Sequence, residues 1–123
     1  MGKTGTPSGL DRNQEAELKK RLLDARAALV ERRSNALRDR GTLLSEVEDE
    51  GDAASRADHE DKLVTLAENE HMLLAEIDHA LGKFERGEYG LDEQTGEPIG
   101  YPRLSVIPWA RLAATTQERE ERR

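Results

Sequence analysis

The chain has 123 residues, 37% of them charged and only 35% hydrophobic, and its formal net charge at pH 7 is -7. So few apolar residues fit a small core with a long solvated element attached. The negative charge argues against general nucleic-acid binding, because phosphate neutralisation needs a surplus of Lys and Arg. The lack of cysteine excludes disulfides and a thiolate zinc site, in agreement with a reducing, cytoplasmic location. No apolar run approaches the roughly 20 residues that span a bilayer, so no membrane association is expected.

A first amphipathic helix is predicted from about Asp11 to Arg40, after a flexible leader at residues 1–10. The helical segment contains neither Gly nor Pro. Its apolar residues recur at helical spacing among Lys, Arg and Glu, at Leu18, Leu22, Ala25, Leu29 and Ala36. One face of this helix is therefore expected to pack against a partner helix.

An acidic joint is predicted at Gly41 to Asp52. Gly51 can break the first helix, and Asp52 is placed to cap the N-terminus of a second one. Between positions 41 and 60 Arg56 is the single Lys or Arg, against the acids Glu46, Glu48, Asp49, Glu50, Asp52, Asp58 and Glu60. We therefore expect an acidic tip around residues 46–54, where the two helices meet.

A second helix is predicted from about Ala53 to Arg86. Its apolar residues alternate at three- and four-residue steps, with Glu70 as an interruption, at Leu63, Leu66, Leu73, Ile77, Ala80 and Phe84. This pattern is a heptad seam. Residues 11–86 should therefore form an antiparallel coiled-coil hairpin, with helices roughly 45 Å long at 1.5 Å per residue.

The last segment, residues 87–123, begins with the turn-rich stretch YGLDEQTGEPIGYPRL and ends in a short helical tail from Trp109 onward. Apolar residues are available there to form a small core: Ile99, Tyr101, Leu104, Val106, Ile107, Trp109 and Leu112. The segment has the glycine-punctuated look of a metal-stapled module, although it contains no cysteine or histidine.

This C-terminal part resembles the DksA/TraR family of bacterial transcription regulators. The resemblance rests on FERGEYG at the end of the second helix, Ile99-Gly100, Arg103-Leu104, Pro108 and a C-terminal helix. In the family, a zinc finger with two Cys-x2-Cys pairs follows the second helix. Its four ligand positions fall here on Asp92, Thr95, Ala113 and Thr116.

These four residues cannot form a structural zinc site. Alanine has no donor atom, threonine hydroxyls are poor zinc ligands, and tetrahedral zinc needs four donors. A zinc site built instead from His59, His71 or His79 is disfavoured, because each is better explained as a solvated or seam-edge helix residue. The expected fold is therefore mainly α, with a coiled-coil hairpin and a zinc-finger-like module that lacks zinc or any other cofactor and is held by apolar burial.

The resemblance also gives the acidic tip a role. In the family, a tip pattern Asp-x-x-Asp-x-Ala enters the secondary channel of RNA polymerase, and the family's spacing places it on Asp49, Asp52 and Ala54. A thin helical rod with terminal carboxylates suits such a role. The resemblance implies a monomeric, non-enzymatic regulator of initiation that binds RNA polymerase and makes no direct sequence-specific DNA contact.

Members that respond to ppGpp, the alarmone of the stringent response, hold it against basic residues near the junction of rod and finger. The corresponding positions here are Glu76, Ile107 and Gln117. A carboxylate repels a polyphosphate, so no strong ppGpp response is expected. Two alternatives remain open: a Gre-like factor whose tip carboxylates help polymerase cleave backtracked RNA, and a plain coiled-coil adaptor protein.

Overall fold

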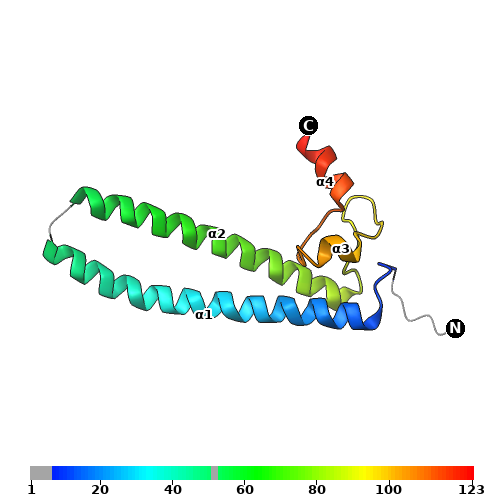
Figure 1. The fold of residues 1–123 in the computed structure, drawn as a ribbon, viewed down its shortest axis with the longest axis horizontal. Helices are drawn as coiled ribbons and strands as arrows, with labels where there is room; N and C mark the ends of the chain where they lie inside the picture. Colours follow the sequence, from blue (N-terminus) through cyan, green and yellow to red (C-terminus); the bar gives the residue numbers. More distant parts are fainter. Residues whose placement is uncertain (1–6, 51–52) are drawn as a thin grey trace. The chain divides into compact units, whose positions relative to one another are not determined.

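The protein is mainly helical. The computed structural model describes the backbone of residues 7–50 and 53–123, and side chains at 7–38, 62 and 65–123. Its helices are α1 (Arg12–Glu50), α2 (Ala53–Arg86), α3 (Tyr101–Leu104) and α4 (Ala114–Glu121) (Figure 1). Over the described residues, none of them has an apolar stretch long enough to cross a bilayer.

The N-terminus of α1 is fixed by a reciprocal cap. The backbone N–H of Gln14 donates to Asp11 Oδ1 at 2.7 Å, and the Gln14 side chain accepts from the Asp11 N–H at 3.1 Å. This arrangement satisfies two amide groups at the helix start. The helix then continues through Gly41 to Glu50, so Gly41 does not begin the joint. A glycine inside a helix costs only about 0.5–1 kcal/mol relative to alanine.

The second helix has the predicted bounds, Ala53–Arg86. It ends at Gly87, whose φ of 72° lies in the left-handed region that favours glycine. The Glu88 N–H donates to the Lys83 carbonyl at 2.8 Å and closes the last turn.

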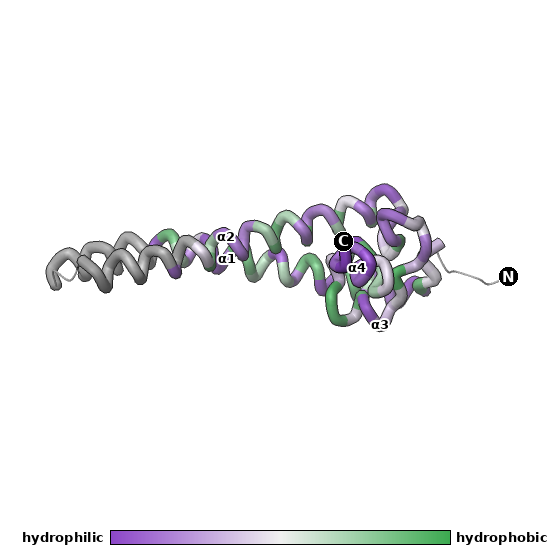
Figure 2. The backbone as a smooth tube through the Cα atoms, turned by 90° about the horizontal axis from the view of Figure 1, so that it is seen from above, coloured by the Kyte–Doolittle hydropathy of each residue, from purple (hydrophilic) through white to green (hydrophobic). Residues whose placement is uncertain are grey.

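Contacts divide the chain into two units, one of residues 1–25 and 76–123 and the other of residues 26–75. In the first unit, the beginning of α1 lies beside the end of α2 (Figures 1 and 2). The predicted seam is confirmed there, because Leu18, Leu22 and Ile77 are fully buried and Ala80 is 3% exposed. Figure 2 shows such apolar positions recurring between hydrophilic stretches of both helices.

The end of the expected flexible leader belongs to this core. Ser8 and Leu10 are 3% and 1% exposed. They lie against Gly90, whose φ is 87° and where a Cβ atom would come within 2.8 Å of the Ser8 Cβ. The leader expected at residues 1–10 is therefore too long, because its last residues are packed.

In the second unit the two helices also run antiparallel. Arg32 forms an ion pair with Glu70 at 3.0 Å, and Arg33 lies 3.4 Å from a ring nitrogen of His71. Glu70, the acidic residue that interrupts the predicted seam of α2, is thus paired with Arg32 of α1. Leu29 is buried as expected, at 4% exposure.

The seam prediction is wrong at two positions of this unit. Leu66 is 57% exposed and Ala36 is exposed as well. Leu37 of α1 is 73% exposed too, so these apolar side chains of the second unit are not packed in a seam. Leu63 lies outside the described side chains.

Two adjacent leucines of α1 give a matched test of this core. Leu22 is fully buried, whereas Leu23 is 49% exposed. We expect Leu22→Ala to lower the free energy of unfolding by about 2–5 kcal/mol, because it leaves a cavity, and Leu23→Ala to lower it by less than about 1 kcal/mol. Urea unfolding followed by circular dichroism measures both, and equal losses would contradict this core.

Candidate functional site

Two regions are candidates for function, and the first is the expected acidic tip. Asp49 lies in the last turn of α1 and Ala54 in the first turn of α2. Asp52 and the side chains of the other two residues lie outside the described residues. The tip therefore stays a prediction from the sequence.

The second region is the C-terminal module, where the four positions aligned with zinc ligands meet around one carboxylate. Asp92 Oδ1 accepts hydrogen bonds from the backbone N–H groups of Gln94 at 2.8 Å and Thr95 at 3.0 Å. Its Oδ2 accepts from the Ala113 N–H at 2.7 Å. The Thr116 side chain is a further hydrogen-bond partner. Asp92 and Thr116 are each only 2% exposed.

The hydrogen bonds keep this buried carboxylate ionised. Burial alone would raise the pKa of Asp92, but the bonds from the Ala113 N–H, the Thr116 side chain and the N–H groups of Thr95 and Gln94 outweigh it and lower the pKa to about 2. The Asp92 side chain is thus a buried anion surrounded by donors.

The donor set does not fit zinc. Ala113 contributes an N–H group and a methyl group, neither of which can coordinate a cation, and both carboxylate oxygens of Asp92 already accept hydrogen bonds. Among the described side chains, no group of three or more His, Asp and Glu could hold a metal. Apolar burial also contributes, since Leu104 is fully buried and Ile99 is 9% exposed, whereas Val106 is 72% exposed. The expectation of apolar burial in place of metal therefore missed the polar centre of the module.

A short hairpin carries Asp92 into position. Leu91 and Pro98 form an antiparallel bridge, and the Ile99 N–H donates to the Gly90 carbonyl at 2.8 Å. Tyr89 precedes it, stacked on Phe84 with ring centroids 3.9 Å apart, and its hydroxyl donates to the Pro108 carbonyl at 2.8 Å. Burial raises the pKa of Tyr89, so it remains a donor. The aromatic pair thus ties the end of α2 to the module.

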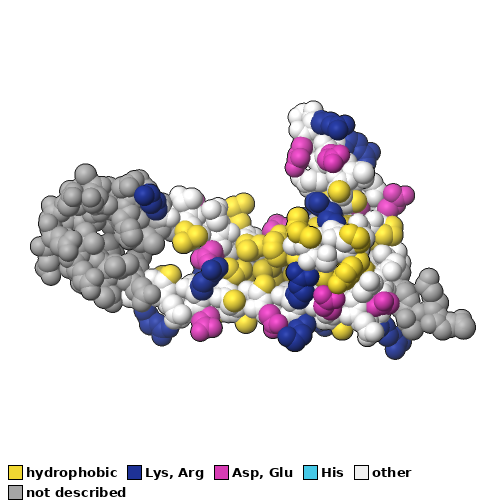
Figure 3. Space-filling view, in the orientation of Figure 1, with side chains coloured by type: hydrophobic (Ala, Val, Ile, Leu, Met, Phe, Trp, Pro, Cys, Tyr) yellow, Lys and Arg dark blue, Asp and Glu magenta, His cyan; other side chains and the backbone are white. Residues whose placement is uncertain are grey.

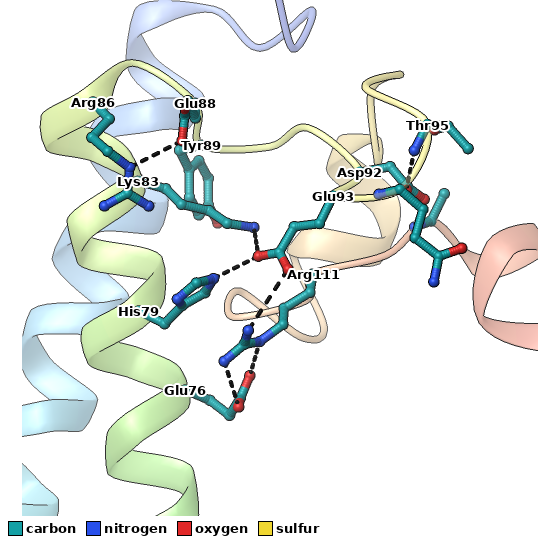
Figure 4. A network of polar contacts seen from close by, with 12 residues as sticks. Glu76, His79, Lys83, Arg86, Glu88, Tyr89, Asp92, Glu93, Thr95 and Arg111 are labelled. Carbon is teal, nitrogen blue, oxygen red and sulfur yellow. Dashed lines mark hydrogen bonds and ion pairs between the residues drawn. The ribbon is translucent and has the colours of Figure 1, made fainter. Parts of the chain in front are cut away.

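The neighbouring Glu93 joins the module to α2 (Figure 4). Its Oε2 lies 2.5 Å from His79 Nε2 and 2.7 Å from Lys83 Nζ, and its Oε1 lies 3.7 Å from a guanidinium nitrogen of Arg111. Burial alone would raise the pKa of Glu93, but the bonds from Lys83 and His79 lower it. Sequence reasoning missed this cluster, since it treated His79 as a solvated or seam-edge residue.

A cleft of about 440 Å³ lies beside this cluster. The three positions that the resemblance aligned with ppGpp-binding residues line it together: Glu76, Ile107 and Gln117. Arg111 also lines the cleft, and it forms two hydrogen bonds with the Glu76 carboxylate, at 2.7 and 2.9 Å, which raise the pKa of Arg111. Figure 3 shows hydrophobic side chains gathered on the visible face of the module, with Lys and Arg beside them.

The last helix starts later than predicted. It begins at Ala114 rather than Trp109. The residues before it are held by the hairpin, because the Glu93 N–H donates to the Arg111 carbonyl at 2.9 Å and the Ala113 N–H donates to Asp92. A non-helical segment at 111–113 is therefore part of the module.

No protein-family model matches the chain, but individual relatives do. It is 43% identical over 84 residues to the RNA polymerase-binding transcription factor DksA of Caulobacter vibrioides, which covers 66% of this chain and 59% of that protein. It is 37% identical over 107 residues to an uncharacterized protein of Aquifex aeolicus, covering 85% and 74%. The structure of transcription factor DksA2 from Pseudomonas aeruginosa superposes with a TM-score of 0.78, at 36% identity, over 91% of this chain and 86% of that one.

The hydrogen-bonded Asp92 should make stability depend on acid. Because its pKa is lowered from 3.8 to about 2, its contribution is complete above about pH 5 and is lost as the pH falls toward about 2. The total loss is about 2 kcal/mol, roughly half of it by about pH 3.

Urea unfolding at several pH values would measure this loss, with Asp92→Asn as the variant that lacks it. Glu97→Gln, an exposed acid in the same turn, is the matched control and should follow the wild type. Identical pH profiles for wild type and Asp92→Asn would contradict the assignment.

Proposed function

The chain belongs to the DksA family, and from this membership we propose that it is an RNA polymerase-binding transcription factor that regulates initiation and has no catalytic activity of its own. The similarity to the DksA2 structure, 36% identity over 86% of that chain, is the observation that carries the proposal. The Caulobacter vibrioides relative is named for polymerase binding, and this chain matches 59% of its length.

We propose that the tip works through Asp49, Asp52 and Ala54 in the secondary channel of the polymerase. Two antiparallel helices are narrow enough to enter a pore that excludes a globular domain. Carboxylates at their end can interact with basic side chains or with the environment of the active-site Mg²⁺. Ala54, two residues after Asp52, would keep the tip small.

We further propose that the C-terminal module is a zinc-finger-like base that needs no metal and stays outside the channel. Its polar centre at Asp92 and its attachment to α2 through Glu93 give it a fixed structure within the first unit. The exposed Val106 and the half-buried Ile107 and Trp109 offer apolar contact area on its surface.

The cleft supports the proposal that ppGpp has little effect through this site. The Glu76 carboxylate stands at one of the three aligned positions, and Ile107 and Gln117 supply no positive charge. Arg111 is held by the Glu76 carboxylate in two hydrogen bonds. A polyphosphate would have to separate this pair and approach the half-buried carboxylate of Glu76.

The tip proposal is tested with core RNA polymerase. We expect the wild-type chain to be retained on immobilised polymerase at micromolar concentration and to change open-complex lifetime. The variants Asp52→Asn and Ala54→Thr should still be retained on the polymerase. If the tip interacts with the catalytic centre, their effect on open-complex lifetime should be at least about tenfold smaller than that of the wild type.

Asp58→Asn is a matched control, because it removes one acid outside the Asp49-x-x-Asp52-x-Ala54 pattern and should behave as wild type. Absence of wild-type binding would overturn the proposed function. Stimulated cleavage of RNA in a stalled elongation complex, with no effect on initiation, would support the Gre-like alternative instead.

The ppGpp proposal has its own measurement. Addition of ppGpp to an in vitro transcription reaction, with a polymerase variant that lacks other ppGpp sites, should change the effect of this factor by less than about twofold, equivalent to about 0.4 kcal/mol. A tenfold or larger response would show that Glu76 and Arg111 separate to admit the nucleotide.

A further inference from the structure

Two segments of the C-terminal module, residues 92–95 and 113–116, are far apart in the sequence and are joined at one buried side chain. In a structural zinc finger, a cation at such a crossing binds four inward-facing donor atoms. We propose that the Asp92 carboxylate is the cross-link that takes the place of a metal ion in this module. The charge at the centre is then negative instead of positive, and the surrounding groups are hydrogen-bond donors instead of metal ligands. The proposal does not depend on polymerase binding.

The direction of the hydrogen bonds carries the inference. The N–H groups of Gln94 and Thr95 point at Oδ1 of Asp92 from its own turn, and the N–H of Ala113 points at Oδ2 from the second segment. Thr116 completes the set from the first turn of α4. An anion at the centre satisfies these donors, whereas a cation would face positively polarised N–H groups.

The surrounding backbone holds both segments in register. The Asp92 N–H donates to the Glu97 carbonyl at 2.7 Å, and the Glu93 N–H donates to the Arg111 carbonyl at 2.9 Å. Arg103 Nε donates to the Leu112 carbonyl at 2.8 Å from α3. The second segment therefore reaches Asp92 in one alignment, in which the Ala113 N–H meets the carboxylate.

Removal of the carboxylate should release the second segment. Asp92→Ala leaves three part-buried N–H groups without their acceptor, and donors withdrawn from water without partners destabilise a fold. We expect at least about a tenfold lower folding equilibrium constant, together with altered near-ultraviolet circular dichroism from Tyr89 and Trp109. Glu97→Ala, at an exposed acid of the same turn, should change neither.

The wild-type chain should contain less than about 0.1 equivalent of zinc, and its melting temperature should be unchanged in EDTA, as expected for a fold without a structural metal. The reciprocal variant carries Asp92→Cys, Thr95→Cys, Ala113→Cys and Thr116→Cys. If these positions surround one centre, it should bind one equivalent of zinc, give the absorption of a tetrahedral thiolate site with Co²⁺, and melt lower in EDTA.

Three results would overturn the proposal: stoichiometric zinc in the wild type, equal stability of Asp92→Ala and Glu97→Ala, or a four-cysteine variant that binds no metal. The last measurement remains informative if Asp92→Ala does not fold. None of these measurements involves polymerase, so their failure is distinguishable from failure of the proposed function.

Discussion

The C-terminal module depends on the burial of one charge, the carboxylate of Asp92. An ionised carboxylate withdrawn from water is strongly unfavourable unless hydrogen bonds replace its hydration. Here the replacements come from two distant segments, through Gln94 and Thr95 on one side and Ala113 on the other. Because a displaced segment would leave the charge unsatisfied, the carboxylate selects one arrangement of the chain, which is the task that a metal performs in a zinc finger.

The adjacent acid has a different task. Asp92 is buried inside the module, whereas Glu93 begins the turn that follows and its side chain faces α2. There Glu93 contacts His79 and Lys83, one helical turn apart. Two neighbouring carboxylates thus fix first the internal structure of the module and then its attachment to the helix, within the same unit of the chain.

The helices were predictable from the sequence because periodic burial is a local pattern. The spacing of Leu18, Leu22 and Ile77 identified their buried faces, and the resemblance aligned the positions that meet at Asp92. It was not predictable that these positions would meet at an anion surrounded by hydrogen-bond donors, since the donors are mostly backbone N–H groups, which leave no signature in the sequence. For the same reason the C-terminal helix was predicted too early: nothing in Ala113 indicates that its N–H is needed by Asp92. Nor did the spacing of Leu66 reveal that its side chain is exposed.

An arginine that lines a cleft does not by itself form an anion-binding site, because its charge can be matched inside the protein. Arg111 lines the cleft, but it makes two hydrogen bonds to Glu76 and lies 3.7 Å from Glu93. Recruitment of its guanidinium by a phosphate would leave both carboxylates beside the incoming charge. Since a charge-assisted pair is broken only if a stronger one replaces it, the two acids make Arg111 a structural group of the module. Asp92 follows the same principle, because its charge is also satisfied inside the protein, by the N–H groups of Gln94, Thr95 and Ala113.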